Sequence, residues 1–442
     1  VRKELTARLK LSNEDIDRGG LRITTTVSKK AQDAAVAAVD KNMPKTKAEN
    51  VYAGLVAIRP GDGAVVAMYG GADYQARQFS AATDATIPAG STFKPFALIA
   101  ALQQGISTHT TFDGSSPMKD ASLGITRLEN YANQSFGTID LRKATASSIN
   151  TAYIRLNAKI TPTATRDAAV AAGLPADTLG LGTEITNVLG TSSPHVIDVA
   201  NAYASIAAEG RRAAPYLVKR VTSPAIDVDY TMAPQVVEAF SKDVAADTID
   251  AMETVTSTGG TASRASGLGR PSAGKTGTSE DRKSVWFAGF TPQLSTAVAM
   301  FKDVNGVEEP LTNIGGAAEV ASNGPPLSMW LDFMKAALDG EKPVDFPKRV
   351  GIGDDKAPTR APITAPPPSD QAPTQDPVPT QDPVPTRPPA PSTQPTRPTA
   401  PVPTTAPPTS KPTSTVTPSA TVAPVANRPV TPPGQPTAAP VP

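Results

Sequence analysis

The stretch that decides the fold reads Pro88-Ala89-Gly90-Ser91-Thr92-Phe93-Lys94-Pro95-Phe96. It predicts a loop that turns at Gly90 and opens a helix at Ser91, because an apolar run follows and ends near Gly105. Ser91 and Lys94 lie three positions apart, so their side chains share one helical face. An amine that burial keeps uncharged can accept the serine proton, and the serine then becomes a nucleophile that forms an acyl ester.

The same Ser-x-x-Lys pattern occurs at Ser116-Pro117-Met118-Lys119, where the surroundings differ. Pro117, with Gly114 and Asp120 nearby, is typical of a turn, and no long apolar helix follows it. A helix start with a solvated lysine would also explain the pattern at Ser91 if that pattern stood alone. The assignment of Ser91 as the nucleophile therefore depends on further signals in the chain.

Two further signals follow in chain order. Ser148-Ile149-Asn150 interrupts a helical stretch, and Lys275-Thr276-Gly277-Thr278 opens a β-rich one. Taken singly, the first is typical of a polar turn and the second of the entry to a strand. Three such signals in one order, each in suitable surroundings, indicate one common site.

The first two signals supply the candidate catalytic residues. Lys94 would act as the base toward Ser91, with its pKa lowered by burial and by the second cation, Lys275. Ser148 would pass a proton to the leaving amine. The amide of Asn150 would orient Lys94 and hold the backbone of a substrate.

The third signal supplies the candidate substrate-binding residues. Lys275, Thr276 and Thr278 offer a cation and two hydroxyls for a terminal carboxylate. Gly277 would let the backbone approach a ligand closely, and the strand could take an extended peptide by strand addition. The backbone N–H groups of Ser91 and Thr278 would form an oxyanion hole.

Composition excludes several other kinds of chemistry. The 442 residues carry a net charge of +1 and 5% aromatic residues, so nothing indicates a nucleic-acid partner. There is no cysteine and there are only two histidines, His109 and His195, so we expect no disulfide, metal or other cofactor, and a Ser-His-Asp triad is disfavoured. The chain has no run of about 18 apolar residues, no signal peptide and no initiator methionine, and we interpret it as a piece of something longer.

The order of elements predicts an α+β fold. Two strands, at 51–58 and 64–68, come before a helical block, and three strands, at 274–278, 285–290 and 294–301, come after it. A closing helix is expected at 327–338. This order predicts an antiparallel five-stranded sheet built from both ends of the domain and flanked by helices, with an inserted helical subdomain and a catalytic cleft between the two.

Three regions follow from the changes in composition. Residues 1–27 are interpreted as a linker or the remnant of a preceding domain, and residues 28–345 as the catalytic domain. Residues 346–442 are rich in Pro, Thr and Ala and contain a direct repeat of Thr-Gln-Asp-Pro-Val-Pro. Such a composition cannot bury a core, so we predict a disordered tail that serves as a spacer, as a glycosylated stalk, or as neither.

With these motifs the chain resembles the penicillin-binding protein family, and within it the transpeptidase domain of bifunctional class A members from high-GC Gram-positive bacteria. The resemblance covers roughly residues 19–334. Beyond the three motifs it includes Gly20-Leu21-Arg22-Ile23-Thr24-Thr25-Thr26, Leu55-Val56-Ala57-Ile58, Asn201-Ala202-Tyr203-Ala204, Trp286-Phe287-Ala288-Gly289-Phe290-Thr291-Pro292 and Gly315-Gly316.

The resemblance implies a β-lactamase/transpeptidase-like fold and a serine acyltransferase of peptidoglycan biosynthesis. Ser91 would be acylated by the penultimate D-Ala of a stem peptide that ends in D-Ala-D-Ala, with release of D-Ala. The amine of a neighbouring stem would then take the acyl group, and β-lactams would inhibit by acylating the same serine. Class A members carry a membrane anchor and a glycosyltransferase domain before this region. We expect both to be absent from this chain, which would act at the extracytoplasmic face of the plasma membrane or in the cell wall.

Alternatives remain at this point. A serine β-lactamase shares the three motifs and needs a carboxylate near the acyl group, for which Glu184 is a candidate. A β-lactam sensor would bind without turnover, and a wall protein with a decayed site would not bind at all. The acceptor amine, the type of stem peptide and the balance between transpeptidation and carboxypeptidation are not determined by the sequence.

Overall fold

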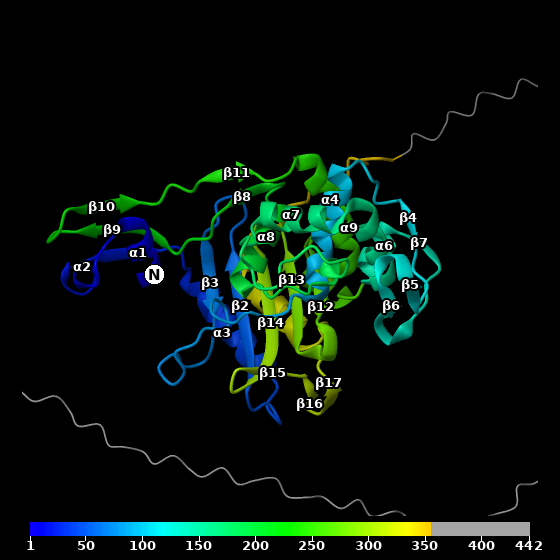
Figure 1. Ribbon diagram of the computed structural model, residues 1–442. Helices are drawn as coiled ribbons and strands as arrows, with labels where there is room; N and C mark the ends of the chain where they lie inside the picture. The colour runs from blue at the N-terminus through cyan, green and yellow to red at the C-terminus, as the bar shows by residue number, and fades with distance from the viewer. Residues whose placement is uncertain (355–442) are drawn as a thin grey trace, which may run out of the picture. The chain divides into compact units, whose positions relative to one another are not determined.

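The computed structural model describes residues 1–354. At its centre lies a β-sheet whose strands come from two distant parts of the chain (Figure 1). The strands run antiparallel in the order β12-β13-β14-β2-β3, and a short strand, β15, pairs with the far end of β14 as a sixth. Their bounds are β2 Val51–Ile58, β3 Val65–Tyr69, β12 Ala273–Thr278, β13 Ser284–Phe290, β14 Ser295–Val304 and β15 Val307–Glu309. The early strand β2 pairs with the late strand β14, so the prediction of a sheet built from both ends of the domain is confirmed.

Both faces of this sheet are covered, which explains why the buried stretches of its central strands are mostly apolar. On β14, Val298 and Met300 pack with α3 (Lys29–Asn42) and α10 (Pro325–Ala337). The alternate residues Ala297, Ala299 and Phe301 pack with the core of the helical block on the opposite face. The period of two along the strand thus separates two hydrophobic cores.

The helical block lies between the early and late strands in the sequence. Its helices are α4 Lys94–Gln103, α5 Leu141–Ala146, α6 Asn150–Ile160, α7 Pro162–Ala172, α8 Val196–Ala207 and α9 Lys242–Thr256. The helix predicted at Ser91 is present as a 3-10 turn, η1 (Gly90–Phe93), that continues into α4. Residues 94–102 are all buried, so α4 is an interior helix with apolar residues on every side.

Short paired strands also occur outside the main sheet, and the sequence did not predict them. They are β4 Thr111–Asp113 with β7 Thr138–Asp140, β5 Met118–Asp120 with β6 Ile125–Leu128, β8 Arg211–Ala213 with β11 Val236–Glu238, and β16 Thr312–Ile314 with β17 Ala317–Glu319. Each is only three or four residues long and mostly exposed, so none carries a recognisable alternation of apolar residues.

The first residues form a small structure of their own with a distant hairpin. The stretch from Leu21 to Thr26 contains the strand β1 (Arg22–Thr25), which pairs with β9 (Val218–Ser223) and not with the main sheet. With β10 (Val228–Thr231) they make a three-stranded sheet. The helices α1 (Arg2–Leu9) and α2 (Asn13–Arg18) precede it. The boundary after residue 27 stays a prediction.

The packed chain continues past the predicted start of the tail. The ring of Phe346 packs edge-on against Phe290 at 5.6 Å between ring centres. The backbone N–H groups of Val350 and Ile352 donate to the buried carboxylate of Asp247 on α9, both at 2.6 Å. The first residues of the tail predicted from residue 346 therefore pack against β13 and α9. The rest of that prediction falls on residues 355–442, which lie outside the described residues.

Within residues 1–354, no helix has both the length and the apolar composition that a crossing of the bilayer requires.

Candidate active site

Three hydrogen bonds from distant elements hold the turn that carries Ser91. The indole Nε1 of Trp286 and the hydroxyl of Ser284, both on β13, donate to the carbonyl of Pro88 at 2.8 and 2.7 Å. The buried hydroxyl of Tyr203 on α8 donates to the carbonyl of Thr92 at 2.8 Å. The turn is thus fixed before and after Ser91 by groups from β13 and α8.

Two glycines allow this turn to lie against strand β12. Gly90 has φ of +55°, and a Cβ atom there would lie 2.6 Å from the carbonyl carbon and oxygen of Thr278. This close approach brings the backbone beside Ser91 against Thr278. The backbone N–H groups of Ser91 and Thr278 are the predicted oxyanion hole. At Gly277 a Cβ atom would lie 2.7 Å from Thr92 Cγ2, so the missing side chain makes room for the turn. The close approach of this backbone to a ligand stays a prediction.

Lys94 is completely buried, and its amine lies among oxygen atoms of the second motif. Nζ donates to the carbonyl of Ser148 at 2.7 Å and to Asn150 Oδ1 at 2.8 Å, and it lies 3.2 Å from Ser148 Oγ. Burial lowers the pKa of Lys94 well below its usual value, and the charge of Lys275 lowers it further. A neutral amine has two N–H groups for the two carbonyl oxygens, and its lone pair is left for a hydroxyl proton.

The motif Ser148-x-Asn150 lies at the break between α5 and α6, as the sequence predicted. Ser148 has φ of +55°, a left-handed backbone conformation that ends one helix before the next begins. Lys275 Nζ donates to Ser148 Oγ at 2.7 Å. The hydroxyl of Ser148 therefore lies between two buried amines, those of Lys94 and Lys275.

Lys275 comes from β12, on the sheet side of the site. It is fully buried, and burial lowers its pKa to about 7. The hydroxyl of its neighbour Thr276 forms a hydrogen bond with the hydroxyl of Thr261 at 2.9 Å. Thr261 was not among the predicted site residues. Thr278, the last residue of the strand, is partly exposed.

The structure brings Lys94, Ser148, Asn150 and Lys275 into one hydrogen-bonded cluster. Ser91 lies one helical turn before Lys94, but within the described residues its hydroxyl makes no hydrogen bond to the amine. Both Nδ2 and Oδ1 of Asn150 have protein partners, since Nδ2 donates to the carbonyl of Glu129 at 2.9 Å. Asn150 therefore holds Lys94 in this structure, as the sequence analysis expected.

The competing candidates lie elsewhere. Ser116 donates to Asn133 Oδ1 at 2.7 Å, and Lys119 is an exposed residue of β5 rather than of a helix. Glu184 is exposed and, among the residues that the structure describes, has no hydrogen bond to the cluster.

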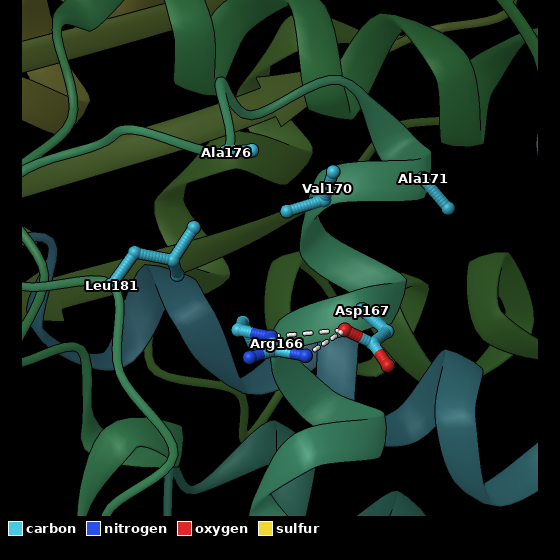
Figure 2. Close-up of a pocket in the computed structure, with 6 residues that line it drawn as sticks. All are labelled: Arg166, Asp167, Val170, Ala171, Ala176 and Leu181. Carbon is cyan, nitrogen blue, oxygen red and sulfur yellow. Dashed lines mark hydrogen bonds and ion pairs between the residues drawn. The ribbon is translucent and has the colours of Figure 1, made fainter.

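A surface hollow of about 450 Å³ lies against α7 (Figure 2). It is lined by Arg166, Asp167, Val170, Ala171, Ala176 and Leu181. Arg166 and Asp167 form an ion pair with each other at 2.7 Å, so the charges that border the hollow are already compensated. No motif residue lines it.

Residues 53–322 match the family model described as the penicillin binding protein transpeptidase domain, which covers more than half of the chain. The chain therefore belongs to this family, and the resemblance drawn from the motifs is confirmed.

Among the described residues, no three His, Asp or Glu side chains gather where they could hold a metal ion.

Among curated proteins, the chain is similar to penicillin-binding protein 1A of Mycolicibacterium smegmatis, with 36% identity over 84% of this chain and 48% of the relative. It is 35% identical to penicillin-binding protein 1A of Mycobacterium tuberculosis, over 80% of this chain and 44% of that protein. The chain thus spans about half the length of these relatives.

Solved structures agree with this placement. PonA1 from M. tuberculosis superposes with a TM-score of 0.71 and 33% identity, over 86% of this chain and 98% of that chain. The complex of PonA1 with penicillin V gives a TM-score of 0.70 and 34% identity, over 79% of this chain and 94% of that chain. The predicted transpeptidase-like fold is therefore confirmed.

Proposed function

We propose that this chain is a serine D,D-transpeptidase that cross-links peptidoglycan stem peptides through an acyl-enzyme on Ser91. The observation that carries the proposal is the buried cluster in which Ser148 Oγ lies between Lys94 and Lys275, at the head of the helix that Ser91 begins. Membership of the transpeptidase family supports the same reaction.

In the acylation step, Ser91 Oγ attacks the carbonyl carbon of the penultimate D-Ala. The hydroxyl proton passes to the uncharged amine of Lys94, which burial keeps ready to accept it. The negative charge that develops on the carbonyl oxygen is stabilised by the N–H groups of Ser91 and Thr278. The C–N bond to the terminal D-Ala then breaks, and the proton returns through Ser148 to the departing amine.

The terminal carboxylate of the donor peptide is the group that Lys275, Thr276 and Thr278 would bind. Lys275 has a pKa of about 7, so an arriving carboxylate would favour its charged form. Thr278 lies at the end of β12, next to the Ser91 turn, and is partly exposed. This division places the leaving D-Ala on the sheet side of the site.

In the second step, the amine of a neighbouring stem peptide attacks the ester carbonyl. Lys94 takes a proton from that amine and passes it to Ser91 Oγ as the ester C–O bond breaks, and an amide cross-link forms. Since these peptides belong to the cell wall, we infer that the chain works at the extracytoplasmic face of the plasma membrane. A β-lactam would acylate Ser91 in the same way, and the penicillin V complex of PonA1 supports this expectation.

Incubation with a fluorescent penicillin tests this function. The label should appear and persist, mass spectrometry should place the adduct on the peptide that contains Ser91, and Ser91→Ala should abolish it. Ser116→Ala, in the second Ser-x-x-Lys pattern, should label normally. Rapid loss of the label would indicate a β-lactamase instead, and an adduct on Ser116 would refute the assignment.

A second assay addresses the natural reaction. A donor peptide ending in D-Ala-D-Ala, mixed with a peptide that carries a free side-chain amine, should release D-Ala and yield a cross-linked product. Release of D-Ala without a cross-link at any concentration of acceptor would show a carboxypeptidase rather than a transpeptidase.

A further inference from the structure

Asn130 is a buried residue outside the three motifs, in the segment between β6 and β7. Only 5% of it is exposed. Its Nδ2 donates to the carbonyls of Gly114 and Gln134, both at 2.9 Å. Its Oδ1 accepts from the backbone N–H of Thr151 at 3.1 Å. The side chain thus joins residues 114–134, most of which are at least partly exposed, to the beginning of α6.

That helix has no cap of its own. The residue at its N-cap, Ile149, is apolar and makes no capping hydrogen bond. The first N–H groups of a helix have no partner within the helix, and a side-chain oxygen usually accepts from the second or third of them. Thr151 is the second residue of α6, so Asn130 supplies the missing oxygen from another part of the chain.

The same short segment also fixes the amide of Asn150, the first residue of α6. Asn150 Nδ2 donates to the carbonyl of Glu129, the residue directly before Asn130, at 2.9 Å. This contact decides which way the amide faces, and it leaves Oδ1 toward Lys94 at 2.8 Å. Residues 129 and 130 therefore hold both the start of the helix and its catalytic side chain.

We propose that Asn130 is a positioning residue for acyl transfer. It caps α6 and thereby keeps Asn150 in the orientation that presents Oδ1 to Lys94. The inference rests on the proposed function, because it gives a part in acylation to a residue that does not contact the reacting atoms.

The test compares acylation rates of the full chain with a fluorescent penicillin, together with thermal unfolding midpoints. The matched control is Asn157→Ala. Asn157 is also buried on α6, and it donates to the carbonyl of Ile185 and to Asn187 Oδ1, both at 2.8 Å, without touching a motif residue. Both alanine variants lose a buried amide, so both should unfold at lower temperature.

Only Asn130→Ala should slow acylation, by about tenfold beyond the control, a factor typical of a misplaced catalytic group. It should also move the acid limb of the pH–rate profile to lower pH. A displaced Asn150 no longer accepts from Lys94, and the charged form of the amine loses more from this than the neutral form does. An equal rate for Asn130→Ala and Asn157→Ala would overturn the inference.

Two further variants separate capping from folding. Asn130→Asp keeps an oxygen for Thr151 and loses the two donated hydrogen bonds, so its rate should stay within about threefold of the wild type even if its unfolding midpoint falls. In the Asn150→Ala background, Asn130→Ala should add less than about twofold, because the one residue acts through the other. A tenfold slower Asn130→Asp, or a fully additive double variant, would contradict the inference.

If the wild-type chain takes no label at all, the proposed function fails, and the inference fails with it. A labelled wild type with unaltered Asn130→Ala kinetics overturns the inference alone.

Discussion

The side chains in the two halves of the site are held in position by different kinds of contact. Lys275, in the sheet half, is placed by the pairing of β12 with β13 and by the packed layers around the sheet. Ser148 and Asn150 belong to the helical half. Ser148 lies at a helix break with a positive φ, and the start of α6 at Asn150 is held by single hydrogen bonds to residues 129 and 130. The loss of one hydrogen bond should therefore disturb catalysis more in the helical half than in the sheet half.

The two lysines also differ in charge. The pKa of Lys94 is lowered by burial first and by Lys275 second, whereas that of Lys275 is lowered to about 7 by burial alone. Both shifts favour the uncharged amine, and Lys94 has the additional contribution of a second cation, whereas Lys275, with a pKa of about 7, carries part of a positive charge at neutral pH. This difference supports Lys94 as the proton acceptor and Lys275 as the partner of a carboxylate.

The largest expected effect belongs to the base. Lys94→Met should slow acylation by a fluorescent penicillin by about a thousandfold, within the range that general bases supply. The chain should still fold, since methionine fills similar space and no amine is left buried. Lys119→Met, at the exposed lysine of the second Ser-x-x-Lys pattern, should react at the wild-type rate. Equal rates for the two variants would show that Lys94 is not the base.

The contact between the Ser91 turn and the sheet half can be broken at Gly90. Gly90→Ala should lower the free energy of unfolding by about 3 kcal/mol, since the strain of a positive φ adds to a clash with Thr278. Gly124→Ala is the matched control, because Gly124 has φ of +70° and nothing lies within 4 Å of the place its Cβ would take. It should lose only about 1 kcal/mol in urea denaturation. A similar loss in both variants would contradict the close approach of Gly90 to Thr278.

The buried amine of Lys275 should make stability depend on pH. Its pKa is about 7 in the folded chain, against an ordinary value of 10.5. Between these values the unfolded chain binds more protons, so the free energy of unfolding rises with pH, by up to about 1.4 kcal/mol per pH unit. Lys94, whose pKa is also lowered, contributes with the same sign.

Urea denaturation at several pH values between about 7 and 9.5 measures this rise. Lys275→Met should flatten part of it, whereas Lys335→Met, at an exposed position of α10, should leave it unchanged. A wild-type slope retained in Lys275→Met would mean that this amine is charged in the folded chain.

The smallest expected effect concerns the bond that links the Ser91 turn to α8. Tyr203→Phe removes the hydroxyl that donates to Thr92 and should lower the free energy of unfolding by about 1 kcal/mol. Acylation should change by less than about threefold, because Trp286 and Ser284 still hold the turn. Tyr131→Phe, at a residue 71% exposed, should change neither quantity, and an equal loss of stability there would contradict the account.

The sequence predicted the parts of the fold and site that are local. The strands of the main sheet are long apolar runs, and the break at Ser148 follows from polar residues within a helical stretch. The motif lysines were predicted to influence each other, and the structure places both amines against Ser148 Oγ.

The parts that the sequence did not predict depend on contacts between distant segments. Tyr203, Thr261 and Asn130 act on the site through partners that no spacing reveals, and each is an ordinary residue in its own stretch. The contact of Gly277 with the Ser91 turn is also of this kind, since a side chain there would meet Thr92, which is distant in the sequence. Residues 346–354 also belong to the packed part of the chain, because Phe346 contacts β13 and Asp247 on α9 accepts from the backbone of Val350.

The protonation state of Lys94 tests the central claim most directly. Nuclear magnetic resonance of the chain with labelled lysine side chains can follow each amine through a pH titration, with the signal of Lys94 identified by its disappearance in Lys94→Met. Lys94 should lose its proton well below the usual 10.5 of a lysine amine, and Lys275 should titrate at about 7. A Lys94 amine that remains charged up to about pH 10 would contradict this claim.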